Sequence, residues 1–336
     1  MADDTTSRLP ILVLGDGGWG TALAMVLEES GHDVRVWGHD PAYTQEIETT
    51  RRNPRFLSGV RIPDGVRFGS DARALARDVD VVFSVIPTQF VGGVVERIGD
   101  ALPARALYVS CSKGFERGTL ELPSRRLATC LPDAAIAVLS GPSHAEEVSR
   151  GLPTTVVVAS ADSAVARRAQ ELFTAPYFRI YTSSDPLGVE IGGAAKNVIA
   201  LAAGISDGLG FGDNARAALI CRGCSEITRL GVALGARRET FVGLSGLGDL
   251  VATATSLHSR NRAVGTRIGQ GESLESILAS TQKVAEGVET TRSVHELARR
   301  IDVELPITAE VHAMLFERKP ARQAVEDLMG REPKAE

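Results

Sequence analysis

The sequence has few cysteines, few aromatic residues and no long apolar run. Four cysteines in 336 residues are too few for a disulfide-stabilised scaffold (Cys111, Cys130, Cys221 and Cys224). No stretch reaches the roughly 18 consecutive apolar residues of a membrane-spanning helix. The polar, acidic start at Met1–Arg8 does not resemble a secretory signal. We therefore expect a cytoplasmic protein with no membrane span.

Strong charge of either sign is absent too. Lys and Arg number 37 against 42 Asp and Glu, which gives a net charge of −5. Nucleic-acid binding depends on clustered Lys and Arg, so this balance argues against nucleic acid as a main partner. Six histidines are scattered without an H-x-x-x-H pair, and we expect no metal site. Hydrophobic residues at 43% indicate a globular chain of one large or two medium domains.

The first half alternates short apolar runs with helix-like segments. Val and Ile dominate several of these runs, which are nearly continuous, as in strands buried on both faces of a parallel sheet. The predicted strands are Leu9–Leu14, Val34–Trp37, Val79–Ile86, Arg105–Ser110, Ala134–Leu139, Thr154–Ala159 and Phe178–Tyr181. The predicted helices between them are Thr21–Glu29, Phe90–Ile98, Leu120–Leu131 and Ala164–Phe173. This alternation predicts a doubly wound α/β domain over residues 8–185.

The second half has almost no strand signal. The pattern predicts helices at Leu187–Ser206, Ala215–Leu234, Leu274–Leu278, Thr290–Ile301 and Ala309–Phe316, with a Gly-rich stretch at Thr240–Leu257. We therefore expect an all-α domain over residues 186–330.

A glycine-rich turn follows the first predicted strand. Gly15-Asp16-Gly17-Gly18-Trp19-Gly20 has the G-x-G-x-x-G spacing and opens the predicted helix Thr21–Glu29. Glycines permit a tight turn and close approach of a pyrophosphate, and the helix N-terminus supplies partial positive charge. In this strand–turn–helix setting the motif predicts a dinucleotide site rather than a plain connection.

The end of the second strand leaves the choice of dinucleotide open. A carboxylate there favours NAD, and a cation favours the 2′-phosphate of NADP. His39 and Asp40 compete for that position. Asp40 also precedes Pro41, and this pair is equally typical of a helix N-cap with proline at the first helical position.

Polar residues follow three later strands, at the sheet edge where open α/β sheets bind ligands. They lie after Ile86, after Ser110 and after Leu139. Lys113, in Ser112-Lys113-Gly114, is the candidate ligand-binding lysine of this group, and its alternative is a solvated surface lysine.

Lys196 is the most unusual residue of the second half. Within Leu187–Ile205 only Glu190 and Lys196 are charged, and the rest is mostly Gly, Ala, Val, Ile and Leu. A lysine inside such a helix must be paired or lose its proton, unless it extends to the helix surface. A buried amine with a lowered pKa can serve as a general base, and Lys113 nearby would lower that pKa further.

Two polar features follow. Asp249 lies in the Gly-rich turn Gly246–Leu250, where it either contacts a substrate hydroxyl or Lys196, or caps the turn. Ser259-Arg260-Asn261-Arg262 places a hydroxyl and a guanidinium at a predicted helix start. Arg normally favours a helix C-terminus, so this placement indicates an anionic ligand such as phosphate. An exposed helix start is the alternative.

Cys221 and Cys224 have the C-x-x-C spacing of redox and metal pairs. No strand precedes them and no second pair exists, so we interpret them as small buried residues of a helix.

Over nearly its whole length the chain resembles the NAD(P)-dependent glycerol-3-phosphate dehydrogenases of the bacterial type. The resemblance lies in several long motifs in order, at residues 15–24, 112–116, 140–148, 192–200, 204–215, 246–250, 259–261 and 284–287. It implies a Rossmann-like domain followed by a helical domain, interconversion of glycerol 3-phosphate and dihydroxyacetone phosphate for phospholipid synthesis, and a homodimer.

The resemblance also assigns site residues. Lys196 matches the lysine that takes the C2 hydroxyl proton. The matched substrate-contacting positions are Lys113, Gly141, Ser143, Lys196, Asp249, Ser259, Arg260 and Asn261. The matched cofactor-contacting positions, with the glycines of the motif, are Gly15, Gly17, Gly18, Trp19, Gly20, His39, Lys113, Ala145, Arg260, Val284 and Glu286.

The chain departs from the family in two places: Gly18 stands where relatives often have Ser, and Cys221 and Cys224 where they often have Thr and Leu. Two other functions stay open at this point. One is a related dehydrogenase acting on a β-hydroxy acid or sugar acid, which would need a carboxylate clamp in place of Ser259–Asn261. The other is a non-catalytic redox sensor, which would need neither Lys196 nor Asp249.

Overall fold

The computed structural model describes residues 8–280 and 285–332. The chain divides into two compact units by its internal contacts. The first combines Met1–Ser112 with Leu122–Pro186, and the second combines Lys113–Glu121 with Leu187–Glu336. The segment Lys113–Glu121, within the predicted range 8–185 of the α/β domain, groups with the helical unit instead.

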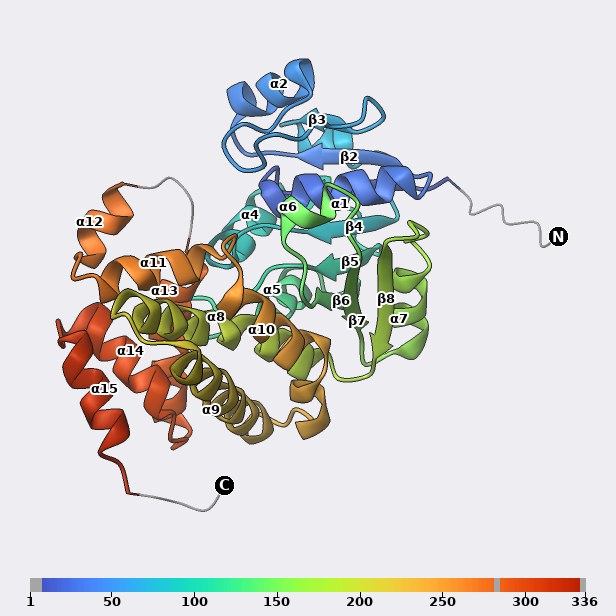
Figure 1. Ribbon diagram of the computed structural model, residues 1–336. Helices are drawn as coiled ribbons and strands as arrows, with labels where there is room; N and C mark the ends of the chain where they lie inside the picture. The colour runs from blue at the N-terminus through green and yellow to red at the C-terminus, as the bar shows by residue number, and fades with distance from the viewer. Residues whose placement is uncertain (1–7, 281–284, 333–336) are drawn as a thin grey trace. The chain divides into compact units, whose positions relative to one another are not determined.

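The first unit is built on one eight-stranded sheet (Figure 1). Its order is β3-β2-β1-β4-β5-β6-β7-β8, and the first six positions have the doubly wound order of dinucleotide-binding sheets. The strands are β1 (Pro10–Leu14), β2 (Asp33–Trp37), β3 (Arg67–Gly69), β4 (Val81–Ser84), β5 (Leu107–Ser110), β6 (Ala135–Ser140), β7 (Thr154–Ala159) and β8 (Phe178–Ser183).

Alternate residues of these strands supply two separate cores. Ile11 and Val13 of β1 point into a cluster covered by α1 (Gly18–Glu29), α2 (Pro41–Thr50) and α7 (Ser163–Gln170). Leu12 and Leu14 point into a second cluster covered by α3 (Ala72–Leu75), α4 (Val91–Ile98) and α5 (Pro123–Cys130). Burial on both faces explains why the strands are continuously apolar.

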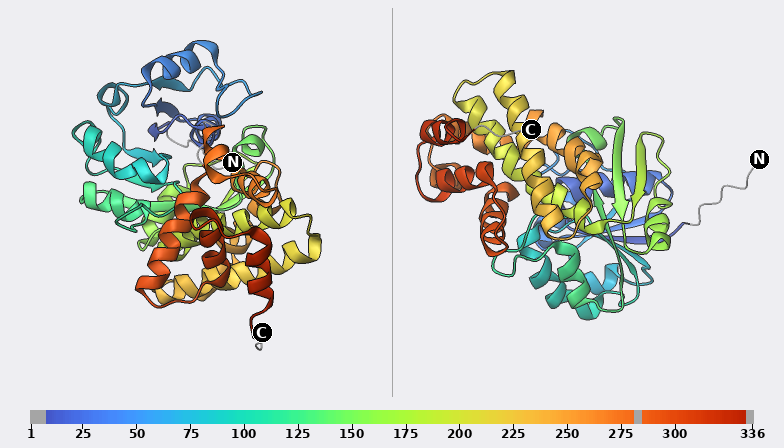
Figure 2. Two further views of the ribbon diagram at one scale, coloured as in Figure 1. Left: turned by 90° about the vertical axis from the view of Figure 1, so that its left-hand side faces the viewer. Right: turned by 90° about the horizontal axis from the view of Figure 1, so that it is seen from below.

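The predicted parallel arrangement of the strands has one exception, because β7 runs antiparallel to β6. The right-hand view of Figure 2 shows β7 and β8 (green) side by side at one end of the sheet. A parallel crossover needs a dozen or more residues, usually with a helix. Residues 141–153 connect β6 to β7 and include only the four-residue helix α6 (Ala145–Val148), so they lack the full helix that usually joins parallel strands.

Further details differ from the prediction, among them the short helices α3 and α6, which were not predicted. The strand β3 was not predicted, since three residues give no readable periodicity. The helix predicted from Leu120 begins instead at Pro123, because Leu120 has a left-handed backbone with φ 59° and proline favours the first helical position.

Among its described residues the second unit contains helices and loops and no strand. After α8 (Pro186–Gly208) and α9 (Asp213–Ala233) come the short turns η3 (Arg238–Val242) and η4 (Leu244–Gly248). The remaining helices are α10 (Asp249–Thr255), α11 (Arg260–Gly269), α12 (Leu274–Ala279), α13 (Glu286–Arg300), α14 (Pro306–Phe316) and α15 (Ala321–Met329). Of these, α10 and α15 were not predicted.

Helix α8 is the central element of this unit. Its length and apolar composition alone would suit a membrane span, but its most apolar stretch is entirely buried within the protein. Residues Gly188 to Ser206 are all buried. It is therefore a core helix around which the other helices pack, and any charged residue it carries is held inside the unit.

Candidate functional site

The glycine-rich turn between β1 and α1 has a backbone that other residues would not tolerate. Gly15 has φ +120°, and a Cβ there would lie 2.8 Å from the carbonyl oxygen of Val85. A Cβ at Gly20 would lie 2.0 Å from the carbonyl oxygen of Gly15. A Cβ at Gly17 would meet nothing within 4 Å, and no side chain caps the helix that follows. The N-terminus of α1 therefore follows a turn whose backbone is left uncovered at Gly17. This is the arrangement that binds a pyrophosphate.

The predicted cofactor-contacting residues around this turn come together within the first unit. A Cβ at Gly18 would lie 3.8 Å from the Cβ of Ala145, the first residue of α6. Trp19 is half-buried and its ring centroid lies 6.5 Å from that of Phe178.

The predicted substrate residues of the first unit lie just before α6. Gly141 has φ +134°, and the Ser143 hydroxyl donates to the Gly141 carbonyl oxygen at 3.1 Å. Thus Gly141 and Ser143 form one turn directly after β6.

At the end of β2 the structure separates the two competing residues. The side chain of Asp40 accepts hydrogen bonds from the backbone N–H groups of Ala42 and Tyr43, at 3.1 and 3.2 Å. The N-cap interpretation of Asp40 is therefore confirmed. His39 is the exposed side chain of the pair at this edge.

A carboxylate that the sequence analysis did not assign lies at the same place. Asp16, inside the glycine motif, is buried, and a Cβ on Gly38 would lie 2.2 Å from its Oδ2. The Thr44 hydroxyl is 3.4 Å from that oxygen but only 2.6 Å from the Asp40 carbonyl oxygen, so its proton goes to Asp40. Burial raises the pKa of Asp16 above its usual value. The sequence analysis assigned only the glycines of the motif, although the carboxylate among them could have been noticed in the sequence.

Three buried serines end three neighbouring strands. Ser84, Ser110 and Ser140 are the last residues of β4, β5 and β6, and Ser84 is paired with Ser110 across the sheet. Their hydroxyl oxygens have no hydrogen-bond partner among the described residues. Buried polar groups normally have partners. Orphaned hydroxyls at the carboxyl ends of the strands, together with the bare turn at Gly17, fit a polar ligand at that edge of the sheet.

Lys196 lies on α8 and is 5% exposed, so it does not extend to the surface. Its Nζ donates to Asp249 Oδ1 and to Thr253 Oγ1, the latter at 2.7 Å. Burial lowers the pKa of Lys196, Asp249 raises it and Lys113 lowers it, and the result is a pKa of about 8. Lys196 therefore loses its proton more easily than a solvated lysine.

Asp249 links two lysines. Its Oδ2 accepts from Lys113 Nζ at 2.7 Å while its Oδ1 accepts from Lys196, and we refer to the three residues as the lysine–aspartate cluster. Burial raises the pKa of Asp249, but the two ammonium groups outweigh burial and hold it below its usual value. All three residues belong to the second unit. The cluster carries two positive charges and one negative charge in a water-poor setting.

Local sequence explains how Asp249 reaches α8. It is the first residue of α10 and follows the π-helical turn η4. A Cβ on Gly192 of α8 would lie 2.8 Å from the Ser245 carbonyl oxygen, so only glycine lets this turn rest on the helix. Thr253, one turn further along α10, was missed by the sequence analysis, although its i+4 spacing from Asp249 placed it on the same face.

The predicted phosphate-binding residues form the start of α11. Ser259 is its N-cap, and its hydroxyl accepts from the Arg262 N–H at 3.2 Å. Arg260 is exposed, and Asn261 is buried with its Oδ1 accepting from the Gly287 N–H at 3.0 Å. A Cβ on Gly287 would lie 2.9 Å from the carbonyl oxygen of Asn197. The start of α11 is thus joined through α13 to the residue next to Lys196.

The structure gives fewer contacts for the remaining predicted residues. Glu286 is the first residue of α13, and Val284 lies outside the described residues. Cys221 is exposed and Cys224 half-buried, so the expectation that both are buried is wrong for Cys221. Within residues 8–280 and 285–332, no three His, Cys, Asp or Glu side chains are grouped as metal ligands.

Known proteins resemble the chain along both units. Residues 10–166 match the family model described as NAD-dependent glycerol-3-phosphate dehydrogenase N-terminus, and residues 185–326 match the corresponding C-terminus. A glycerol-3-phosphate dehydrogenase [NAD(P)+] of Geobacter sp. (strain M21) is 50% identical, covering 97% of this chain and 98% of that protein. Its counterpart in Citrifermentans bemidjiense is 49% identical with the same coverage.

A solved structure agrees with these relatives. The crystal structure of glycerol-3-phosphate dehydrogenase from Coxiella burnetii has a TM-score of 0.93 and 38% sequence identity, covering 96% of this chain and 99% of that one. Both halves of the chain are matched, in sequence and in fold, by proteins of one kind. The chain therefore belongs to the family of NAD-dependent glycerol-3-phosphate dehydrogenases.

Proposed function

We propose that the chain catalyses the reversible reaction of sn-glycerol 3-phosphate with NAD(P)+ to give dihydroxyacetone phosphate, NAD(P)H and a proton. The observation that carries the proposal is the buried lysine–aspartate cluster. It supplies an amine with a pKa of about 8, which can take or give a proton at neutral pH. The family to which the chain belongs supports the choice of substrate.

Lys196 is the proposed proton acceptor. In the oxidation its neutral Nζ takes the C2 hydroxyl proton, while the hydride on C2 leaves with its electron pair. In the reduction the Lys196 ammonium donates that proton to the developing alkoxide, and the net positive charge of the cluster stabilises the oxyanion. Asp249 and Thr253 hold Nζ in one position, because they accept two of its hydrogen bonds.

The first unit is proposed to bind the dinucleotide. NAD+ or NADP+ supplies a nicotinamide that accepts hydride when bound. The pyrophosphate is assigned to the bare backbone of Gly15, Gly17, Gly18 and Gly20 at the start of α1. The further proposed contacts with the cofactor are Trp19, His39 and Ala145 of the first unit, with Lys113, Arg260 and Glu286 of the second.

The start of α11 is the proposed phosphate site. Arg260 offers a planar guanidinium, Asn261 an amide, and Ser259 a hydroxyl at a helix N-terminus, and the three together suit a dianion. Lys113, Gly141 and Ser143 complete the proposed substrate contacts. Holding the phosphate fixes C2 relative to Lys196, which lowers the entropic part of the barrier. We also propose a cytoplasmic homodimer that supplies glycerol 3-phosphate for phospholipid synthesis.

The test is the change in absorbance of the reduced nicotinamide with dihydroxyacetone phosphate, in parallel reactions with NADH and NADPH. Oxidation of either cofactor is the expected result, and the ratio of kcat/KM values gives the cofactor preference. A panel of β-hydroxy acids and sugar acids, run in reverse with NAD+ and NADP+, serves as the control. Turnover of a panel member and none of dihydroxyacetone phosphate would replace the proposed substrate. Cofactor binding without any turnover would indicate a sensor.

A further inference from the structure

Helices α8 and α11 pack backbone against backbone along a row of four glycines. A Cβ on Gly204 would lie 2.1 Å from the Arg262 carbonyl oxygen, and one on Gly208 would lie 2.2 Å from that of Thr266. From the opposite helix, a Cβ on Gly265 would lie 2.2 Å from the Leu201 carbonyl oxygen, and one on Gly269 would lie 2.3 Å from that of Ile205. We call these residues the glycine seam. The two helices can approach this closely only because side chains are absent there.

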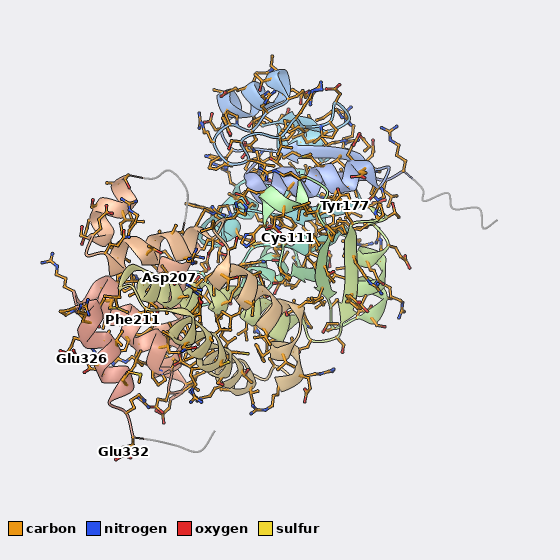
Figure 3. The ribbon with its side chains drawn as sticks, in the orientation of Figure 1. Cys111, Tyr177, Asp207, Phe211, Glu326 and Glu332 are labelled. Atoms are coloured by element: carbon orange, nitrogen blue, oxygen red, sulfur yellow. The ribbon has the colours of Figure 1, made fainter. Side chains whose placement is uncertain are left out.

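An ion pair lies at one end of the glycine seam. Asp207, labelled in Figure 3, is the second-last residue of α8. Its Oδ2 accepts from Arg262 Nε of α11 at 2.7 Å, and its Oδ1 accepts from Arg216 Nη2 of α9 at 2.7 Å. The side chains of Asp207 and Arg262 are 10% and 18% exposed, so water screens the pair only partly.

The pair acts on the turn that carries the proposed phosphate site. Arg262 directly follows Asn261 in the first turn of α11, and its own N–H is capped by Ser259. The proposed proton acceptor, Lys196, lies on the same helix as Asp207 and eleven residues before it, about 16 Å along the axis at 1.5 Å per residue. One rigid helix therefore connects the lysine–aspartate cluster with the anchor of α11.

We propose that Asp207 is a positioning residue that fixes the separation between Lys196 and the phosphate-binding start of α11. The glycine seam sets how closely the two helices approach. The Asp207–Arg262 ion pair fixes the position of α11 along the axis of α8 and its rotation about that axis. The separation then selects substrates whose phosphate and reacting carbon are one fixed distance apart. This inference rests on the proposed function and deepens it.

The proposal predicts that a change at Asp207 affects dihydroxyacetone phosphate but not its separate fragments, which a merely structural role of Asp207 does not predict. Dihydroxyacetone has the reacting carbon and no phosphate, whereas inorganic phosphate has no reacting carbon. Neither of them spans the separation. Dihydroxyacetone phosphate must reach both ends, so it alone responds when α11 shifts on α8.

The test compares Asp207→Asn and Arg262→Met with the matched control Arg216→Met, which removes the other arginine on Asp207 without touching α11. In the two test variants we expect the KM for dihydroxyacetone phosphate to rise about tenfold or more. The kcat/KM for dihydroxyacetone and the inhibition constant of inorganic phosphate should stay within about twofold. Arg216→Met should leave all three within about twofold.

The signs of the charges sharpen the comparison. Asp207→Asn removes a negative charge near the proposed phosphate site, and Arg262→Met removes a positive one. Long-range electrostatics would move phosphate affinity in opposite directions. Loss of position weakens dihydroxyacetone phosphate binding in both variants. Asp207→Asn preserves the size of the side chain, so it also serves if Arg262→Met folds poorly.

Three results would overturn the inference. One is an unchanged KM for dihydroxyacetone phosphate in Asp207→Asn, and another is the same loss in Arg216→Met. The third is an equal rise in the inhibition constant of inorganic phosphate, which would assign Asp207 to phosphate affinity instead of separation. If the wild-type protein does not reduce dihydroxyacetone phosphate, the proposed function fails and takes the inference with it. If the wild-type protein reduces dihydroxyacetone phosphate and the variants are unaffected, the inference fails and the proposed function stands.

Discussion

Asp249 shares one buried carboxylate between two ammonium groups. A buried charge without a partner costs several kcal/mol, so removing Asp249 would leave both lysines uncompensated. With Asp249 in place the cluster keeps one net positive charge at a position that water barely reaches. Such a preformed charge stabilises an oxyanion without reorganising solvent, and it needs no metal ion to do so.

Replacing Lys196 tests the proton acceptor directly. Lys196→Ala should lower kcat by about 10²–10⁴-fold, the usual contribution of a general acid or base. The dissociation constant for NADH, from fluorescence titration, should change little because the variant leaves the first unit intact. Lys319→Ala is the control, since Lys319 forms only peripheral ion pairs with Glu310 and Asp327. A Lys196→Ala enzyme within tenfold of wild type would contradict the assignment.

The pH dependence follows from the pKa of about 8 at Lys196. Oxidation needs the neutral amine, so its kcat/KM should rise through about pH 8 and level off above it. Reduction needs the ammonium and should show the opposite slope. Asp249→Asn removes the group that raises this pKa and should move the midpoint to lower pH. Lys113→Met removes a repelling charge and should move it to higher pH. Equal shifts in both variants would refute this electrostatic account.

Asp16 bears on the choice between the two dinucleotides. Its carboxylate fills the space where a side chain of Gly38 would begin, at the end of β2. Carboxylates at this edge accept from a ribose hydroxyl and repel a 2′-phosphate. Asp16→Asn should therefore lower the ratio of the NADPH to the NADH dissociation constant by about tenfold. Fluorescence titration of each reduced cofactor without substrate measures that ratio. An unchanged ratio would exclude Asp16 as a determinant.

At the scale of helices and strands, one capping interaction comes from a distant helix. Glu226 of α9 is buried, and its carboxylate accepts from the N–H groups of Ile307 and Thr308 at 2.6 and 3.2 Å. The Thr308 hydroxyl donates to the same carboxylate at 3.1 Å. These groups begin α14, whose first N–H groups have no partner within the helix. A single side chain thus joins α9 to the start of α14.

Removing this cap should destabilise the helical unit. Glu226→Ala leaves two buried N–H groups without partners and should cost about 3 kcal/mol, read as a lower midpoint of urea unfolding. Glu226→Gln keeps an acceptor and should cost less. Glu296→Gln is the control, because its ion pair with Arg300 is exposed and contributes at most about 0.5 kcal/mol. Equal midpoints for Glu226→Ala and Glu296→Gln would show that the cap contributes nothing.

The helices and strands with a clear apolar pattern were the ones that could be predicted from the sequence. Seven strands and the long helices α8 and α9 were predicted from the sequence pattern, and a helix start was predicted at Ser259, where α11 begins. The helix α10 directly follows the Gly-rich turn η4, and this stretch of glycines concealed the start of a helix. The reversal of β7 goes with a connection that lacks a full crossover helix, which composition does not show.

The same division applies to the site. Lys196 was identifiable because a charge in an apolar helix conflicts with its surroundings. Its hydrogen bond to Thr253 and the Asp207–Arg262 ion pair depend on which helices meet. Contacts between distant segments have no local signature, so Asp207 was not assigned from the sequence, and Thr253 had only its i+4 spacing from Asp249 as a signal.

At the scale of the whole molecule, the predicted residues are divided between the two units. The glycine-rich turn, Trp19, His39, Gly141, Ser143 and Ala145 belong to the first unit, and the lysine–aspartate cluster and the start of α11 belong to the second. Each unit has its own buried interior, in the sheet cores and around α8. The proposed reaction draws on both, so neither unit is expected to turn over substrate alone.

The segment Lys113–Glu121 belongs to the helical unit but is encoded between two stretches of the first one. A gene chimera joined once, near residue 186, would therefore take Lys113 from one parent and Lys196 with Asp249 from the other. The 2.7 Å contact between Lys113 and Asp249 would then have to form between residues from two different parent proteins. Exchange of the complete helical unit between relatives requires three junctions in the gene, at both ends of this segment and after Pro186, the first residue of α8.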